Sequence, residues 1–146
     1  MTVWLGVVAL ICAGAALAVQ APINAALSRG LGDATLASAA SFLVGFLVMA
    51  AVCALRGAWP GAGAVGQVPL WAWVGGSMGA FYITVLIVAV PLTGALTAAA
   101  ATILGQMVMA MLLDRFGAFG MPVQEITWQR LAGLALVLGG LVLSRS

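Results

Sequence analysis

The side chains best suited to do chemistry in this chain are two uncharged amides. Gln20 and Asn24 are four residues apart, so a helix places them on one face. Pro22 lies between them and lacks an N–H, which frees the carbonyl of Ala18 and predicts a helix break. An unpaired polar group in hydrocarbon costs about 2–7 kcal/mol. These groups are therefore expected to face protein or a wet cavity, either joining helices or binding a solute.

Chemistry that needs a charge or a base has few residues to use. The chain contains no histidine and no lysine, which removes imidazole bases, imidazole metal ligands and a phosphate-loop lysine. Cys12 and Cys53 lie in apolar stretches without C-x-x-C spacing and are expected to be small buried hydrophobes. We predict no enzymatic activity, no metal site and no cofactor. Five arginines are too few for a nucleic-acid partner.

The composition places these residues in a membrane. The chain is 65% hydrophobic and 5% charged, whereas soluble domains are about 45–50% apolar and about 25% charged. The first partner is therefore the lipid bilayer. The uncharged run 70–113 would make roughly 66 Å of helix, about twice the hydrocarbon thickness, so it predicts two spans with a turn at 90–94. We predict an all-α integral membrane protein with one domain, residues 1–146, and five spans of about 3–27, 34–55, 70–90, 92–113 and 128–144.

Local signals agree with these boundaries. Asp33 and Thr127 are expected to be the N-caps of the second and fifth helices. A cleaved signal peptide is the alternative for the first stretch, but no basic region precedes it. The segment Asp114–Pro122 has two glycines and an adjacent pair of opposite charges, Asp114 and Arg115, and is either an interfacial helix stop or a gate.

The charged residues do not predict the orientation of the chain in the membrane. Arg56, Arg115 and Arg130 would lie on one side of the membrane, and Arg29 and Arg145 on the other. Either so few charges carry no signal, or copies insert in both senses and pair as antiparallel dimers. Five helices barely enclose a pathway, whereas ten related by an in-plane twofold axis give the inverted-repeat plan of many transporters.

The other polar residues fit such a pairing. Gln106 lies two-thirds along the fourth span, and the twofold axis would bring it to the depth of Gln20 in the second copy. Ser38 and Ser41 begin the second span but commonly bond to their own helix. Tyr82 suits core packing equally well. The candidate substrate-binding residues are Gln20, Asn24, Ser41, Tyr82, Gln106 and the carbonyl of Ala18.

Small residues predict close helix packing. Gly75 and Gly79 form a G-x-x-x-G pattern, Gly94 continues the pattern in the fourth span, and Gly133 and Gly140 lie seven apart in the fifth. Such residues let helix backbones approach, within one chain or between copies.

Six segments occur in an order that is specific as a set: QAPINA (20–25), ASFLVG (40–45), GGSMGA (75–80), PLTGA (91–95), GQ (105–106) and DRFG (114–117). With them the chain resembles the YdcZ-type members of the drug/metabolite transporter superfamily. The resemblance implies a small multi-pass protein of the bacterial inner membrane that forms half of a ten-helix exporter. It also implies an antiparallel homodimer, or a pair with a close homologue, and polar motif positions at Gln20, Asn24, Ser41 and Gln106.

The expected function is export of a small polar or amphiphilic metabolite by alternating access. The related small multidrug pumps use a glutamate in the first helix, and the absence of an acidic residue there argues against proton-coupled export of cationic drugs. The alternatives are a passive channel, which needs a continuous wet path, and a structural or regulatory membrane subunit without flux of its own.

Overall fold

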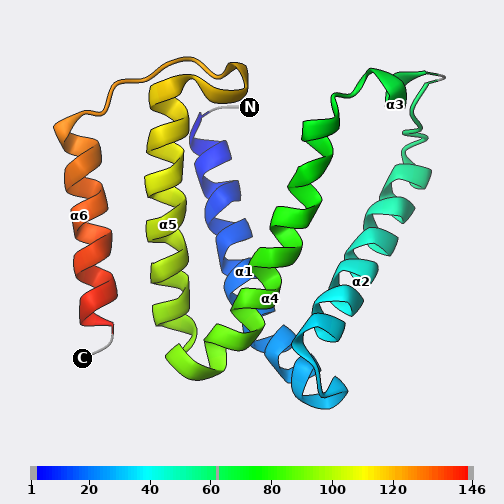
Figure 1. Ribbon diagram of the computed structural model, residues 1–146, viewed down its shortest axis with the longest axis horizontal. Coiled ribbons are helices and arrows are strands. Elements are labelled where there is room, and N and C mark those ends of the chain that lie inside the picture. The colour runs from blue at the N-terminus through cyan, green and yellow to red at the C-terminus, as the bar shows by residue number, and fades with distance from the viewer. Residues whose placement is uncertain (1–2, 62, 145–146) are drawn as a thin grey trace. The chain divides into compact units, whose positions relative to one another are not determined.

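The computed structural model describes residues 3–61 and 63–144, and this part of the chain is 85% helical and contains no strand. The all-α prediction is therefore confirmed. Arg145, which entered the count of charges, lies outside the described residues. The elements in chain order (Figure 1) are α1 (Val3–Leu31), α2 (Ala34–Leu55), α3 (Ala64–Gln67), the 3-10 helix η1 (Leu70–Val74), α4 (Gly75–Thr93), α5 (Ala95–Phe116), the 3-10 helix η2 (Ala118–Gly120) and α6 (Trp128–Leu143).

Four helical segments of the described chain are long and apolar enough to cross a membrane. They are α1, α2, the continuous stretch of η1 with α4, and α5. The fifth apolar helix, α6, has only 16 residues, which is about 24 Å of helix against a hydrocarbon core of about 30 Å. The structure therefore has four helices of spanning length where the sequence predicted five spans.

The chain forms two compact units, residues 1–92 and residues 93–146. The boundary lies where the sequence predicted a turn, but α4 continues through Pro91 to Thr93, further than the predicted end at residue 90. The reversal occurs at Gly94, whose φ of 81° is a conformation that glycine adopts without steric cost. Proline is tolerated here because it removes only one hydrogen bond from the last turn of α4.

In the first unit, α1 and α2 are antiparallel neighbours joined by a tight connection. Asp33 caps α2 as predicted, since its carboxylate accepts a hydrogen bond of 2.6 Å from the amide of Leu36. The core of this unit consists of Ala37 on α2 with Ile83 and Ile87 on α4. The buried residues of α1 and α2 are small, which allows the two backbones to approach closely; they are Ala21, Asn24, Ala25, Ala37 and Ser38.

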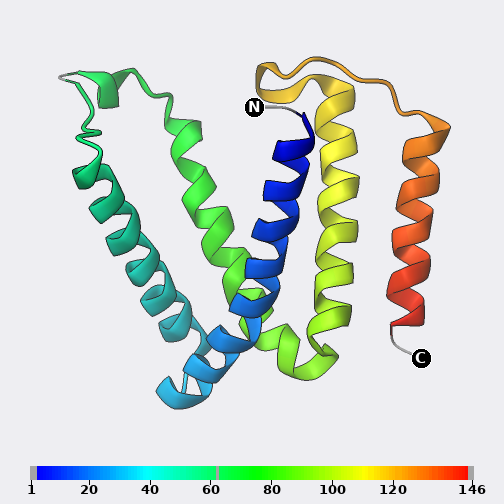
Figure 2. The same cartoon turned by 180° about the vertical axis from the view of Figure 1, so that it is seen from behind.

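Pro22 does not break α1. The helix is continuous from Val3 to Leu31 with Pro22 inside it, so the predicted helix break is wrong. Figure 2 shows the C-terminal part of α1 leaning away from the line of its N-terminal part. A lean of this kind relieves the clash between a proline ring and the preceding turn while the rest of the helical hydrogen bonding continues.

In the second unit, α5 and α6 run antiparallel and side by side, connected by the segment 117–127 (Figures 1 and 2). The hydroxyl of Thr97 donates to the carbonyl of Ser144 at 3.2 Å and so joins the start of α5 to the end of α6. Thr127 caps α6 as predicted, accepting from the amide of Arg130 at 3.5 Å.

The predicted packing glycines differ in what surrounds them. A Cβ on Gly79 would lie 3.3 Å from Cζ of Phe42, so this glycine permits the contact between α4 and α2. A Cβ on Gly133 would lie 3.9 Å from Cε of Met107, which is ordinary contact. Among the described atoms, a Cβ would meet nothing within 4 Å at Gly75, Gly94 and Gly140.

Candidate functional site

A cleft of about 350 Å³ opens among three helices of the first unit. Helix α1 contributes Gln20 and α4 contributes Ile83, while α2 supplies the other lining residues, which are Ser41, Phe42, Gly45, Phe46 and Met49. The volume falls within the range of about 300–1,000 Å³ that is typical of small-molecule sites. Two of the predicted binding residues, Gln20 and Ser41, are thus brought together on one cleft.

The periodicity of α2 explains how one helix makes most of this cleft. Ser41, Gly45 and Met49 follow each other at four-residue spacing, so they lie on one face of the helix over about 12 Å. Along α2, Met49 lies two turns after the half-buried Ser41 with Gly45 between them, and the half-buried Gln20 contributes an amide from α1. Most of the lining is apolar, and its hydrogen-bonding side chains are those of Gln20 and Ser41.

Asn24 lies one turn beyond Gln20 on the same face of α1. Its residue is only 4% exposed, and Nδ2 of its amide is buried without a hydrogen-bond partner. Helical side chains lean toward the N-terminus of their helix, which here is the direction of Gln20. A buried donor without an acceptor costs about 1–3 kcal/mol. Asn24 is therefore the polar residue of the described chain with the clearest need for a partner.

Ser38 is equally buried but fully paired. Its hydroxyl donates to the carbonyl of Ala34 at 2.9 Å, as the prediction for a membrane serine requires. The hydroxyl of Thr84 lies 2.9 Å from Oγ of Ser38 and 2.8 Å from the carbonyl of Ala80, so it links α4 to α2. The sequence interpretation did not single out Thr84. The available signal was a threonine inside an apolar helix, since such a hydroxyl can bond to the carbonyl four residues earlier.

The remaining predicted site residues lie elsewhere. Tyr82 is half-buried and packs against the hydrophobic core of the first unit. Ala18 and Pro22 are both exposed, and since residues two apart in a helix lie on nearly opposite sides, the carbonyl of Ala18 is not on the face of Gln20. Gln106 is exposed on α5 in the second unit. The structure therefore unites Gln20 with Ser41 on one cleft, whose lining does not include Asn24, Tyr82 or Ala18.

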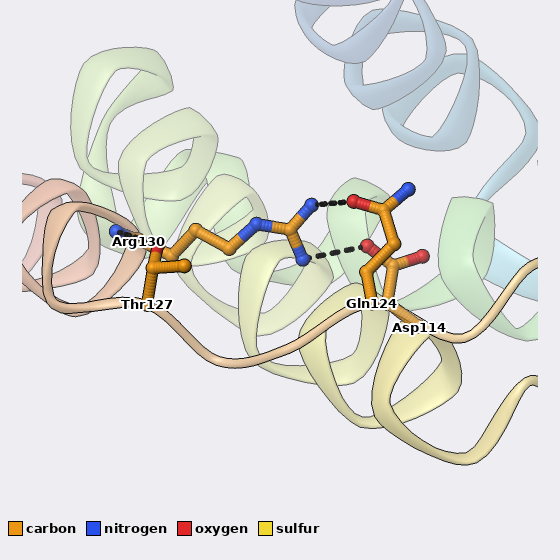
Figure 3. Close-up of polar contacts among 4 residues, drawn as sticks. All are labelled: Asp114, Gln124, Thr127 and Arg130. Atoms are coloured by element: carbon orange, nitrogen blue, oxygen red, sulfur yellow. Dashed lines mark hydrogen bonds and ion pairs between the residues drawn. The ribbon is translucent and has the colours of Figure 1, made fainter.

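Asp114 of α5, Arg130 of α6 and Gln124 of the segment between these helices form a structural cluster in the second unit (Figure 3). Nη1 of Arg130 lies 3.0 Å from Oδ2 of Asp114, and Nη2 of Arg130 donates to the side-chain carbonyl of Gln124. The backbone amide of Gln124 donates to the carbonyl of Asp114 at 2.9 Å. The partner of Asp114 is thus Arg130 rather than the adjacent Arg115, because neighbouring side chains on a helix point apart.

The same segment has the geometry of a helix stop. Helix α5 ends at Phe116, and Gly117 caps it with a φ of 58°. A Cβ on Gly117 would lie 2.8 Å from Cγ2 of Val123, so no other residue fits without rearrangement. Of the two interpretations of this loop, the helix stop is the one that these contacts support.

A second cleft of about 450 Å³ lies between α5 and α6, lined by Leu96, Ala100, Ile103, Val137, Gly140, Leu143 and Ser144. Its polar side chain is Ser144, whose hydroxyl lies 2.7 Å from the carbonyl of Leu141 and 3.2 Å from Oγ1 of Thr97. With this hydroxyl engaged, the second cleft is an apolar surface, so the first cleft is the better candidate for recognising a solute.

These features define a class of protein: a multi-pass α-helical membrane protein with an uncharged, partly polar cleft among its helices. The family described as "Putative inner membrane exporter, YdcZ" matches residues 5–143. The chain belongs to this family, which confirms the resemblance predicted from its motifs. It is a multi-pass protein of the inner membrane and a member of a membrane transporter family. Comparison with curated proteins gave no match, and comparison with solved structures gave none either.

Proposed function

We propose that this protein exports a small polar or amphiphilic metabolite by alternating access, and that the cleft of the first unit is its binding site. The observation that carries the proposal is a cleft lined by Gln20 and Ser41, with the buried, unpartnered amide of Asn24 one helical turn from Gln20. A solute that accepts a hydrogen bond would relieve the penalty of this buried donor. The cleft contains no charged residue, so it suits neutral or zwitterionic solutes better than cations.

The working form in this proposal is an antiparallel homodimer, or a pair with a close homologue, in which α6 is the fifth span of each chain. The balanced arginines support insertion in both senses. The exposed Gln106 also supports it, because an in-plane twofold axis would bring Gln106 of the partner subunit to the depth of Gln20. The open surfaces at Gly75 and Gly140 leave room for the backbone of a second copy.

Metabolite profiling tests the transport proposal. Cells that express the wild type, Gln20→Ala, Asn24→Ala or Ser41→Ala are compared with an empty-vector strain by mass spectrometry of the medium. We expect the wild type to release at least one uncharged or zwitterionic solute, and each variant to release roughly 3–10-fold less, which corresponds to one lost hydrogen bond. The matched control is Val44→Ala on α2, a residue 62% exposed that does not line the cleft.

Two results would contradict the proposal. If the medium of cells with the wild type has the same metabolites as that of the empty-vector strain, the export function is refuted. If all three variants release as much solute as the wild type, the proposed site is refuted. The dimer is tested separately by tagging Met1 and Ser146 and labelling intact cells, where a single orientation for every copy would exclude the antiparallel arrangement.

A further inference from the structure

Gly45 occupies the middle of the cleft wall on α2. It lies one turn after Ser41 and one turn before Met49, and all three line the cleft. A Cβ built on Gly45 would meet no described atom within 4 Å, so the position has open space in front of it. Any side chain added there would occupy the cleft itself rather than displace a neighbouring helix.

The residues on either side of Gly45 differ in chemistry along the cleft. On α2, Ser41 offers a hydroxyl one turn before Gly45, and Gln20 offers an amide to the same cleft from α1. The lining residues that follow Gly45 on α2 are Phe46 and Met49, which offer a ring and a polarisable thioether to an apolar group. A ligand that fits this gradient has one hydrogen-bonding head and one apolar body, and its body must pass the position of Gly45.

We infer that the cleft takes neutral amphiphiles of this kind and that Gly45 is the residue that sets how large their apolar body can be. The inference rests on the proposed function, since it names the substrate class of the same site. It extends that function by assigning head recognition to Gln20 and Ser41 and size selection to Gly45.

A lipid acyl chain is the competing occupant of an open cleft among membrane helices. Hydrocarbon would leave the polar groups of Gln20 and Ser41 without a partner in an environment that offers no water, which is costly. A ligand with a hydrogen-bonding head satisfies them. The two occupants are distinguished by whether a ligand must have a hydrogen-bonding head to bind in the cleft.

The test measures binding to purified protein in phosphatidylethanolamine/phosphatidylglycerol nanodiscs by saturation-transfer NMR. The probes are benzamide, phenylacetamide, phenylpropanamide and phenylbutanamide, which share a neutral amide head and lengthen by one methylene at a time. Ethylbenzene is the probe without a head. The proteins are the wild type, Gly45→Ala, Gly45→Leu, Ser41→Ala and the control Val44→Leu, whose side chain does not line the cleft.

We expect the affinity of the wild type to rise about fourfold with each methylene. Gly45→Leu should retain benzamide within about twofold and lose the longest probe at least tenfold, with Gly45→Ala in between. Ser41→Ala should weaken all four amides by a similar factor, and Val44→Leu should match the wild type. Any binding of ethylbenzene to the wild type should be unchanged in Gly45→Leu.

Equal losses for short and long amides in Gly45→Leu, or no loss in either Gly45 variant, would overturn the role of Gly45. If ethylbenzene binds as tightly as the amides, the recognition of a polar head by Gln20 and Ser41 is refuted, and an acyl chain is favoured as the occupant. These failures are separable from failure of the proposed function, which is decided by release of solute from cells. A cleft that binds amides as expected in a protein that releases nothing would refute export while leaving the selectivity intact.

Discussion

Replacing Asn24 with leucine should stabilise the unliganded protein while it weakens transport. Asn24 and Ser38 are each 4% exposed in the same unit, so both are buried polar residues. They differ in pairing: Nδ2 of Asn24 has no partner, whereas the hydroxyl of Ser38 is bonded to the carbonyl of Ala34 and to Thr84. Removing an unpaired buried donor relieves a penalty, and removing a paired hydroxyl loses hydrogen bonds. The two substitutions should therefore change stability in opposite directions.

The magnitude follows from the burial and the pairing. Relief of the unpaired amide is worth about 1–3 kcal/mol, and the imperfect fit of leucine in place of asparagine costs less than about 1.5 kcal/mol. Asn24→Leu should thus raise the free energy of unfolding by about 1 kcal/mol, the middle of a range from about −0.5 to about 3 kcal/mol. Ser38→Ala should lower it by about 0.5–1.5 kcal/mol, in keeping with about 0.6 kcal/mol for an average hydrogen bond between membrane helices.

The assay is reversible unfolding of purified protein in mixed micelles with increasing sodium dodecyl sulfate, followed by far-ultraviolet circular dichroism. The wild type, Asn24→Leu and Ser38→Ala are measured together, and the export assay is run on the same variants. A loss of stability in Asn24→Leu equal to or greater than that in Ser38→Ala would refute the reasoning. It would mean that the amide of Asn24 has a partner in the resting protein rather than being held for a solute.

Two further predictions concern packing and the cluster between α5 and α6. Arg130→Ala should lower the free energy of unfolding by only about 0.2–1 kcal/mol, because Arg130 and Asp114 are 33% and 28% exposed; a loss above about 3 kcal/mol in the same unfolding assay would contradict this. Gly79→Leu should destabilise by about 1–3 kcal/mol through the contact with Phe42. Gly75→Ala, which meets no described atom, should be neutral or stabilising by up to about 1 kcal/mol, and equal losses at both glycines would show that the difference in their surroundings is unimportant.

The sequence was sufficient for the membrane setting, the helices and their caps, but two of its local predictions were wrong. Pro22 does not break α1, and the cysteines expected to be buried are exposed at Cys12 and half-buried at Cys53, because the side chains of these apolar helices largely face outward rather than into a core.

The scarcity of charge placed the chain in a membrane, and helices lie over each of the predicted apolar stretches. Asp33 and Thr127 were identified as caps because a cap needs only a side-chain oxygen and the next turn of backbone. The ends were less accurate: α4 passes through Pro91, and α1 passes through Pro22. Proline removes one hydrogen bond from a helix, but in a bilayer the backbone has no water to bond to instead, so the remaining helical hydrogen bonds are kept.

Only the tertiary structure decided which polar groups are paired and which face a cleft. The long helices are apolar on all sides, so periodicity does not reveal the face that packs against protein. Ser38 and Asn24 are both polar residues in apolar helices; the bond of Ser38 to its own helix was predictable, whereas its contact with Thr84 and the unpartnered amide of Asn24 follow from packing. Gly45 could not be distinguished from other glycines of the chain, because open space is a property of surrounding helices rather than of the residue. The sequence therefore determined that this protein is helical and lies in a membrane, and the packing of the helices determined its candidate binding cleft.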